Sequence, residues 1–222
     1  MEQRATKKKG LLFLGGGISA ENQISLLSAQ NVYPHIDRNL FDVWPVFIAP
    51  DGQWWLLDDE QAGNWPQLAN LFCGGERIAL RPLAGGLAIH TRIREGVLDL
   101  IFPMMHGPFG EDGTIQGLAQ FFGVPVVGSD MSGSLINMDK LLMKAILAQK
   151  DIPCARYRGF SQAELQETDY RSLGAELFSQ WQCPSLFVKP ARMGSSIGIS
   201  QVHDPSRGWE GDQGVGVGRV IK

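Results

Sequence analysis

The chain has 222 residues, 44% of them hydrophobic and 19% charged, which is the composition of a globular protein with one large or two small domains. Its 20 basic and 23 acidic residues give a net charge of −3 and are spread along the chain, so no nucleic-acid partner is predicted. No stretch approaches the roughly 18 apolar residues of a membrane span, so we expect no membrane partner. The three cysteines lie far apart, so we expect free thiols and a cytoplasmic location.

The chain opens with an apolar run, a glycine turn and a helical pattern. Residues 10–14 predict a strand, residues 15–17 are all glycine, and a helix is expected to open at Ser19. The expected apolar face of that helix carries Ile24, Leu27 and Val32.

Further strands and helices alternate up to residue 127. Residues 43–57 and 78–89 each predict a hairpin, because each range holds two apolar runs around a turn. Residues 97–102 predict one nearly continuous strand, residues 114–122 a helix and residues 124–127 a short strand. The alternation predicts an α/β fold with a doubly wound parallel sheet.

Two glycine-rich loops follow strands of this predicted sheet, at residues 15–17 and 106–113. In open parallel sheets, ligands gather at the carboxyl ends of the strands. We therefore expect both loops to face one crevice.

A second domain is expected to begin near residues 128–134. Residues 137–149 predict one helix, and a Ser161–Glu164 capping box opens the next. Residues 186–190 predict a strand that leads through a loop into extended chain at 199–202. In the helix expected at residues 137–149, Lys140 and Lys144 lie off the apolar face and are available to solvent or to a ligand. That apolar face carries Met138, Leu141, Leu142, Ala145 and Ile146.

The segment 106–117 holds a histidine, two acids and four glycines between a strand and a helix. Such a loop lets the backbone approach a ligand closely. The competing interpretation is a tight turn whose Glu111 and Asp112 only cap the next helix. The loop at 194–198 can offer successive backbone N–H groups to phosphates, and it is not a Walker loop.

Four segments together resemble D-alanine–D-alanine ligases of the ATP-grasp group. They are residues 15–25, 106–117, 138–140 and 187–198, and the resemblance covers almost all of residues 10–204. Asn22 departs from the pattern, since many members carry a basic residue there.

The resemblance implies a fold, a reaction and partners. The fold is a Rossmann-like, pre-ATP-grasp substrate-binding domain at 1–130, then an incomplete ATP-grasp domain whose first subdomain is at 131–205, then an aberrant or disordered tail at 206–222. In the implied reaction, ATP phosphorylates one D-alanine carboxylate and the amine of a second D-alanine attacks the acyl phosphate, for peptidoglycan synthesis. ATP is the implied cofactor with Mg²⁺ or Mn²⁺, and the implied assembly is a homodimer.

The resemblance also assigns roles to residues. Glu21 would accept hydrogen bonds from the D-alanine ammonium, and His106 would donate to the substrate carboxylate. Ser195, the third catalytic residue, would hold Glu21 and the substrate in position. Ser25 and Gly107 would complete the substrate site. The ATP-binding set would be Lys140, Lys189, Gly194, Ser195 and Ser196.

Plainer roles stay open for the same side chains. Glu21 is favourably placed at a helix N-terminus, and His106 can be a buried structural histidine. Ser195 can be a turn serine, and Lys140 can lie on a solvated helix face.

Past residue 204 the sequence departs from the family. Five glycines between 208 and 218 would disfavour the family's next helix by about 5 kcal/mol, while Val220-Ile221 resembles the start of its next strand. An altered reading frame, a mispredicted gene or an artificial boundary each fits this ending. Because the family's metal ligands are expected further on, no metal ligand is predicted in this chain, and we expect it to be catalytically weak or dead.

Two other functions remain open. The chain can belong to a ligase that joins D-alanine to D-lactate or D-serine. It can also be a noncatalytic module that binds D-alanine or dimerises.

Overall fold

The computed structural model describes residues 7–71, 74–167, 169–203 and 219–221. Apart from Arg219–Ile221, the tail expected at 206–222 lies outside the described residues. The chain divides into two compact units, Met1–Leu135 and Ile136–Lys222, and the finer domain limits expected from the sequence stay predictions.

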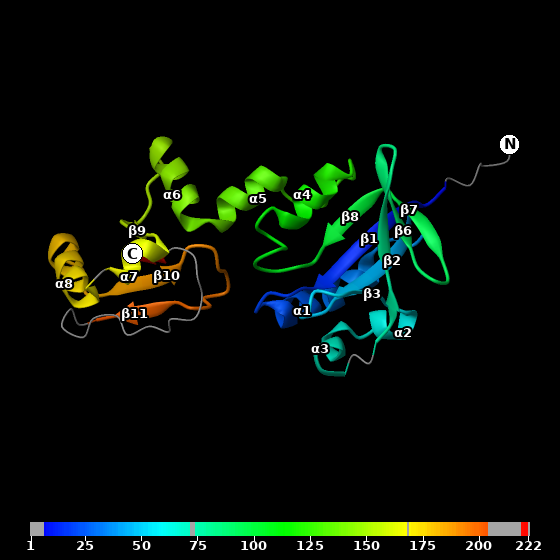
Figure 1. Cartoon of the computed structure of the whole chain (residues 1–222), viewed down its shortest axis with the longest axis horizontal. Helices are drawn as coiled ribbons and strands as arrows, with labels where there is room; N and C mark the ends of the chain where they lie inside the picture. Colours follow the sequence, from blue (N-terminus) through cyan, green and yellow to red (C-terminus); the bar gives the residue numbers. More distant parts are fainter. Residues whose placement is uncertain (1–6, 72–73, 168, 204–218, 222) are drawn as a thin grey trace. The chain divides into compact units, whose positions relative to one another are not determined.

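Unit 1 is built on a five-stranded sheet with the order β4-β3-β2-β1-β8 (Figure 1). Three consecutive strands are parallel: β1 (Lys9–Gly16) lies between β2 (Phe41–Ile48) and β8 (Leu100–Pro103), which ends the sheet. Two short antiparallel strands, β3 (Trp54–Leu56) and β4 (Glu76–Arg77), extend the β2 edge. The parallel sheet and the hairpin at residues 43–57 are confirmed.

Both faces of β1 are buried, which explains its unbroken apolar run. Leu12 and Leu14 belong to one hydrophobic core, and Leu11 and Phe13 belong to another on the opposite face. The first core includes Ile115 and Ala119 of α4 (Thr114–Phe121), and the second includes Leu26 and Ala29 of α1 (Asn22–Val32). The remaining short elements of unit 1 are the 3₁₀ turns Tyr33–His35 and Trp65–Gln67 and the helices α2 (Asp59–Ala62) and α3 (Leu68–Leu71).

The buried face of α1 differs from the prediction. Ile24 and Leu27 are 46% and 50% exposed, and the buried positions are Asn22, Ser25, Leu26 and Ala29. The reason is polar: the Ser25 hydroxyl accepts from the Gly16 N–H at 2.8 Å and donates to the Met104 carbonyl at 2.5 Å. These hydrogen bonds turn a polar stripe of the helix toward the strand ends, and the helix begins at Asn22 rather than at Ser19.

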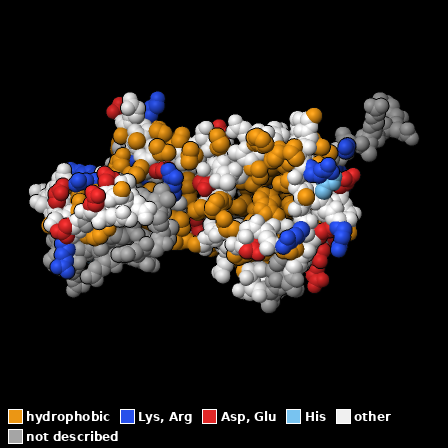
Figure 2. All heavy atoms as spheres, viewed as in Figure 1, with side chains coloured by type: hydrophobic (Ala, Val, Ile, Leu, Met, Phe, Trp, Pro, Cys, Tyr) orange, Lys and Arg blue, Asp and Glu red, His pale blue; other side chains and the backbone are white. Residues whose placement is uncertain are grey.

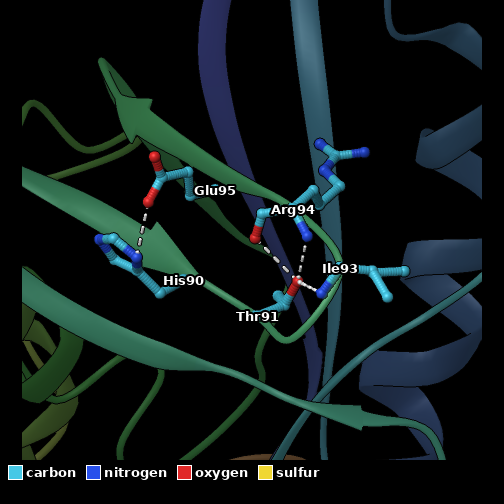
Figure 3. Close-up of polar contacts among 5 residues, drawn as sticks. All are labelled: His90, Thr91, Ile93, Arg94 and Glu95. Carbon is cyan, nitrogen blue, oxygen red and sulfur yellow. Dashed lines mark hydrogen bonds and ion pairs between the residues drawn. The ribbon is translucent and has the colours of Figure 1, made fainter.

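A second, antiparallel sheet of unit 1 joins β5 (Ala79–Leu83), β6 (Gly86–His90) and β7 (Glu95–Leu98). It confirms the hairpin expected at residues 78–89. The turn between β6 and β7 is closed by Thr91, whose hydroxyl accepts from the Arg94 N–H at 2.9 Å and donates to the Arg94 carbonyl at 2.8 Å (Figure 3).

The single strand expected at residues 97–102 is wrong, because the chain changes sheet at Asp99. β7 pairs with β6 and ends at Leu98, whereas β8 pairs with β1 and begins at Leu100. The Asp99 carboxylate accepts from the Gly10 N–H, and the Asp99 N–H donates to the Gly10 carbonyl, both at 2.8 Å. These two hydrogen bonds hold Asp99 at the start of β1, so β7 ends before Asp99 and β8 begins after it.

The strand expected at 124–127 is also not formed; the chain there makes an isolated parallel bridge between Ile101 and Val126. Pro125 has no N–H to donate to a ladder. The helix expected at 114–122 is confirmed as α4, which follows Gly113 with φ +92°.

Two helices replace the one expected at residues 137–149. α5 (Met131–Met138) ends before Asp139, and α6 (Lys140–Gln149) begins after it. Asp139 is extended (ψ 106°), and its carboxylate accepts from the N–H groups of Leu141 and Leu142. An N-cap aspartate therefore interrupts the apolar pattern.

The expected exposure of α6 is wrong as well. Lys144 is only 6% exposed, whereas Leu142 and Ile146 are each 42% exposed. The Lys144 ammonium donates to the Ala155 carbonyl at 3.1 Å and lies over the Tyr157 ring. The lysine therefore buries its apolar stem while its ammonium group keeps a hydrogen-bond partner.

Unit 2 contains an antiparallel sheet with the order β11-β10-β12-β9. Its strands are β9 (Arg158–Phe160), β10 (Leu186–Pro190), β11 (Ser200–Val202) and β12 (Arg219–Ile221). The pairing of β10 with β11 confirms the hairpin-like unit, and β12 forms at the Val220-Ile221 pair. Helices α7 (Gln162–Gln166) and α8 (Tyr170–Trp181) complete the unit, and Ser161 makes the expected capping box.

Candidate functional site

The first group of predicted site residues lies at the carboxyl edge of the parallel sheet of unit 1. β1 ends at Gly16 and β8 ends at Pro103, and the Met104 N–H donates to the Leu14 carbonyl at 2.7 Å. Gly16 and Gly17 have φ of +87° and +119°, a conformation that glycine adopts without strain. The two glycine-rich loops therefore meet at one edge, as predicted.

Glu21 immediately precedes α1 and is 3% exposed. Its N–H donates to the Ser19 hydroxyl at 3.2 Å, and its carboxylate lies against Gly107 so closely that a Cβ there would overlap it. Gly107 has φ +72°. A carboxylate held in this way is placed to accept hydrogen bonds from an ammonium group.

His106 is joined to the same cluster through two hydroxyl groups. Its carbonyl accepts from the Ser19 hydroxyl at 2.8 Å, and its Nε2 atom lies 2.8 Å from the Ser28 hydroxyl oxygen. The Ser25 hydroxyl bridges the two strand ends, as described above for α1. The structure thus brings together Glu21, Ser25, His106 and Gly107.

The sequence predicted Ser19 only as the start of a helix, and it assigned no role to Ser28. Glu21, Ser25 and Ser28 follow the spacing i, i+4, i+7, which places them on one side of a helix. That polar stripe was the available signal. It was overlooked because a polar stripe on a helix is usually its solvated face.

The two acids of the second loop have different roles. The Glu111 carboxylate accepts from the Gly107 N–H at 2.8 Å and so closes the loop, whereas the Asp112 carboxylate accepts from the Thr114 N–H at the start of α4. The buried Gln116 amide donates to the Gly110 carbonyl at 2.8 Å. The capping interpretation therefore holds for Asp112 alone.

The second group of predicted residues lies in unit 2, around the loop that follows β10. The Lys140 ammonium donates to the Met193 carbonyl at 2.5 Å, and its backbone N–H donates to the Ala191 carbonyl at 3.0 Å. Lys189 stands half-buried on β10, with its ammonium 5.6 Å from the centre of the Phe187 ring. Lys140 is thus anchored to the loop rather than free in solvent.

Ser195 and Ser196 adopt left-handed backbone conformations, with φ of +47° and +61°. Such a conformation costs roughly 1–2 kcal/mol for a residue with a Cβ. The Ile197 N–H donates to the Gly194 carbonyl at 3.0 Å, and both serine side chains are exposed. Successive residues in this geometry form a concave backbone that suits an anion.

Asp139 and Arg192 fix the start of this loop, with 2.8 Å between the carboxylate and the guanidinium Nε. Burial raises the pKa of the Asp139 carboxyl. The hydrogen bonds from Arg192, Leu142 and Leu141 act in the opposite direction and leave its pKa lowered. Neither residue was predicted as part of the site.

An open cavity of about 770 Å³ lies at the opposite end of β1 and includes none of the predicted site residues. Figure 2 shows basic side chains beside a histidine near this end of unit 1. The carboxylates that line the cavity already have partners in the protein. Glu95 pairs with His90 at 3.0 Å (Figure 3). Asp42 pairs with Arg94, and the Asp99 carboxylate accepts from the Gly10 N–H. The cavity is lined by Lys7, Lys8, Lys9, Gly10, Asp42, Arg81, Pro82, Leu83, Ala88, His90, Glu95, Gly96, Val97 and Asp99.

Within the residues that the structure describes, no group of three or more His, Cys, Asp or Glu side chains is arranged to hold a metal ion. No helix in the described ranges is both long and apolar enough to cross a lipid bilayer. The two groups of site residues lie in different units, and their meeting in one cleft stays a prediction.

Family comparisons place the chain beside known ligases. The model of the D-ala D-ala ligase N-terminus matches residues 10–129, and that of the D-ala D-ala ligase C-terminus matches residues 146–207. A D-alanine–D-alanine ligase of Deinococcus radiodurans is 38% identical over 200 residues, which are 89% of this chain and 54% of that ligase. One from Geobacillus kaustophilus is 38% identical over 208 residues, 87% of this chain and 53% of that ligase. The chain spans about half the length of these curated relatives.

Solved structures give the same result for the fold. The D-alanine–D-alanine ligase of Coxiella burnetii matches with a TM-score of 0.78 at 26% identity, covering 96% of this chain and 63% of that one. The D-Ala:D-Ser ligase VanG of Enterococcus faecalis matches with a TM-score of 0.75 at 27% identity, covering 97% of this chain and 62% of that one. Since the N-terminal family model matches more than half of the 222 residues, and the parallel sheet carries the predicted loops at its carboxyl edge, this chain belongs to the D-alanine–D-alanine ligase family.

Proposed function

We propose that the chain contributes the D-alanine site and part of the ATP site of a ligase that joins two D-alanines through an acyl phosphate for peptidoglycan synthesis. The observation that carries this proposal is the buried Glu21 carboxylate at the carboxyl edge of the sheet, held against Gly107. A buried carboxylate selects a cationic group as its partner. The ammonium of a free amino acid supplies one.

His106 and Ser195 complete the proposed catalytic set. Ser19 links the His106 carbonyl to the Glu21 N–H, so the backbones that carry the imidazole and the carboxylate are joined through one hydroxyl group. In the proposed site, Glu21 binds the ammonium and His106 donates to the carboxylate of the same D-alanine. Ser25 and Gly107 shape the site, and for Ser195, which lies in unit 2, we propose the orienting role that its place in the family motif implies.

The loop after β10 is the proposed contact with ATP. Lys140 and Lys189 place positive charge near it, and Gly194, Ser195 and Ser196 offer backbone N–H groups in a left-handed turn. Phosphoryl transfer depends mainly on positioning and on electrostatic stabilisation of the phosphate oxygens. Both contributions are available from these residues.

The family pairs ATP with Mg²⁺ or Mn²⁺. The described part of the chain offers no cluster of ligands that fits such an ion. A second copy of the chain is the proposed protein partner, in a homodimer.

Calorimetric titration of the 222-residue chain with D-alanine tests the proposal, with L-alanine as the control. We expect saturable binding of D-alanine and at least about tenfold weaker binding of L-alanine, because a fixed carboxylate and imidazole accept one hand of the amino acid. Equal heats for the two enantiomers would contradict the assignment.

An assay for ADP release with ATP, Mg²⁺ and D-alanine then separates catalysis from binding alone. The chain spans about half of its relatives, and we expect the 222 residues to release little ADP. Binding without ADP release fits the alternative of a noncatalytic module, whereas robust turnover would contradict the expectation of a weak enzyme.

A ligase for D-alanine and D-serine is the second candidate, because VanG, a D-Ala:D-Ser ligase, shares the fold at 27% identity. Adding D-serine or D-lactate to D-alanine in the same assay identifies the second substrate. An increase in ADP release with D-serine would favour this candidate over D-alanine alone, whereas an increase with D-lactate would favour a ligase for D-alanine and D-lactate.

A further inference from the structure

Three hydroxyl groups tie α1 and its preceding turn to the segment that follows β8. Ser19 contacts the His106 carbonyl, Ser25 contacts the Met104 carbonyl, and Ser28 contacts the His106 ring. The bonds of Ser19 and Ser25 are made to backbone carbonyl groups. The Ser28 bond differs because it holds the imidazole side chain.

Ser28 lies one turn beyond Ser25 on α1, on the side that carries Glu21 at the start of the helix. Its hydroxyl oxygen is 2.8 Å from His106 Nε2, in a partly buried environment. A short helix-borne side chain such as serine has few rotamers, so it presents its hydroxyl from a fixed place. The ring is therefore held at one nitrogen by a rigid element.

The two nitrogens of an imidazole have separate roles, because the partner of one decides what the other can do. In the described part of the chain, Nε2 is bonded to Ser28 and no partner contacts Nδ1. A half-turn of the ring about its bond to Cβ would place Cε1 where Nε2 lies and Cδ2 where Nδ1 lies, and this torsion has only a broad twofold preference. The flip would put a carbon atom opposite the Ser28 hydroxyl, so the hydrogen bond to Nε2 opposes it.

We infer that Ser28 is a positioning residue that fixes the His106 ring and thereby reserves Nδ1 for the carboxylate of a bound amino acid. The second half of this inference rests on the proposed function. The first half does not, because ring orientation is a property of the protein without ligand.

Nitrogen-15 NMR of the histidine side chains in the 222-residue chain tests the first half. We expect distinct Nδ1 and Nε2 signals for His106, in contrast to the exposed His35 and His203, whose signals reflect exchange between tautomers. Ser28→Ala should move the His106 signals toward those of the exposed histidines, and Ser28→Thr, which keeps the hydroxyl, should restore them.

Controls separate this effect from a loss of folding. Ser172→Ala removes an exposed hydroxyl in unit 2 that bonds to Asp169, and it should leave the His106 signals unchanged. His90, paired with Glu95, serves as an internal reference in every spectrum. If the His106 signals of the wild-type chain already match those of His35 and His203, or if Ser28→Ala leaves them unmoved, positioning by Ser28 is overturned, whatever the stability of the variant.

Calorimetry with D-alanine tests the second half. Losing one oriented hydrogen bond should weaken binding by about three- to tenfold in Ser28→Ala, with recovery in Ser28→Thr. A changed His106 spectrum with unchanged affinity overturns the link to substrate and leaves the positioning intact. A wild-type chain that binds no D-alanine overturns the proposed function instead, and the NMR result still decides the positioning.

Discussion

Gly107 and Gly85 share a backbone conformation, with φ of +72° and +75°, but not an environment. An added Cβ at Gly107 would overlap the Glu21 carboxylate, whereas at Gly85 it would meet nothing within 4 Å. Alanine at either position costs roughly 1–2 kcal/mol of backbone strain. We therefore expect both variants to lose stability in urea unfolding. Only Gly107→Ala should also abolish D-alanine binding, as measured by calorimetry. Equal binding by the two variants would show that Gly107 is not beside the ligand.

Lys189 and Lys144 make a second contrast at the residue scale. Lys189 is half-buried beside the loop proposed for ATP, whereas the Lys144 ammonium is already bound to the Ala155 carbonyl. Removing a charged hydrogen bond to a phosphate costs about 1.5–3 kcal/mol. Lys189→Met should therefore weaken binding of an ATP analogue by about tenfold or more in fluorescence titration, while Lys144→Met should not change it. The reverse ranking would reject the assignment of Lys189.

At this scale, the sequence predicted the residues that carry charge or special geometry. Glu21, Ser25, His106 and Gly107 were all expected near one another, and the structure clusters them in unit 1. Neither Ser19 nor Ser28 was predicted as a site residue, because the polar stripe that includes Ser28 resembles a solvated helix face and the distant partners of both serines cannot be read from local spacing. Their partners lie 87 and 78 residues away in the chain.

At the scale of elements, Asp139 ends one helix and caps the next. Replacing an N-cap aspartate by alanine costs about 1 kcal/mol, and the partly exposed Arg192 pair adds little to this. Because the pKa of Asp139 is lowered in the folded chain, its stabilisation is present above the ordinary value of 3.8 and is lost as the pH falls through the lower folded-state pKa. Asp139→Ala should therefore be less stable than the wild type in urea at pH 7, and the difference should shrink below pH 3.8. A constant difference would mean that the carboxylate charge does not contribute.

Asp99 has a similar function between strands. Its carboxylate holds the buried Gly10 N–H, so Asp99→Ala leaves that donor without its protein partner and should cost about 1–3 kcal/mol in urea unfolding. Asp42→Ala is a matched control, because it breaks an exposed ion pair with Arg94 that is worth about 0–1 kcal/mol. A larger loss of stability in Asp42→Ala than in Asp99→Ala would contradict the claim that Asp99 stabilises the junction between β7 and β8.

Most element types were predicted from the sequence, whereas two breaks inside apolar segments were not. The strand at 97–102 and the helix at 137–149 each appear continuous, because apolar residues lie on both sides of a single aspartate. In both cases the aspartate binds backbone N–H groups, of Gly10 in one case and of the next helix in the other. Hydrogen bonds of this kind are invisible to hydrophobic periodicity, which records burial alone.

At the scale of the whole molecule, the chain combines two units that each carry part of a proposed site. Unit 1 presents the Glu21 cluster at its sheet edge, and unit 2 presents the loop after β10 with Lys140 and Lys189. The parallel sheet could be predicted because alternating elements leave few topologies.

Binding of D-alanine to Glu21→Gln, measured by calorimetry beside the wild type, tests the central claim most directly. The substitution keeps the shape of the side chain and removes its charge, and the exposed Glu60→Gln is the control. The account predicts that Glu21→Gln weakens binding by about tenfold or more, since a charged hydrogen bond to the ammonium is lost, and that Glu60→Gln has no effect. Wild-type affinity in Glu21→Gln would contradict the claim that this carboxylate binds the substrate.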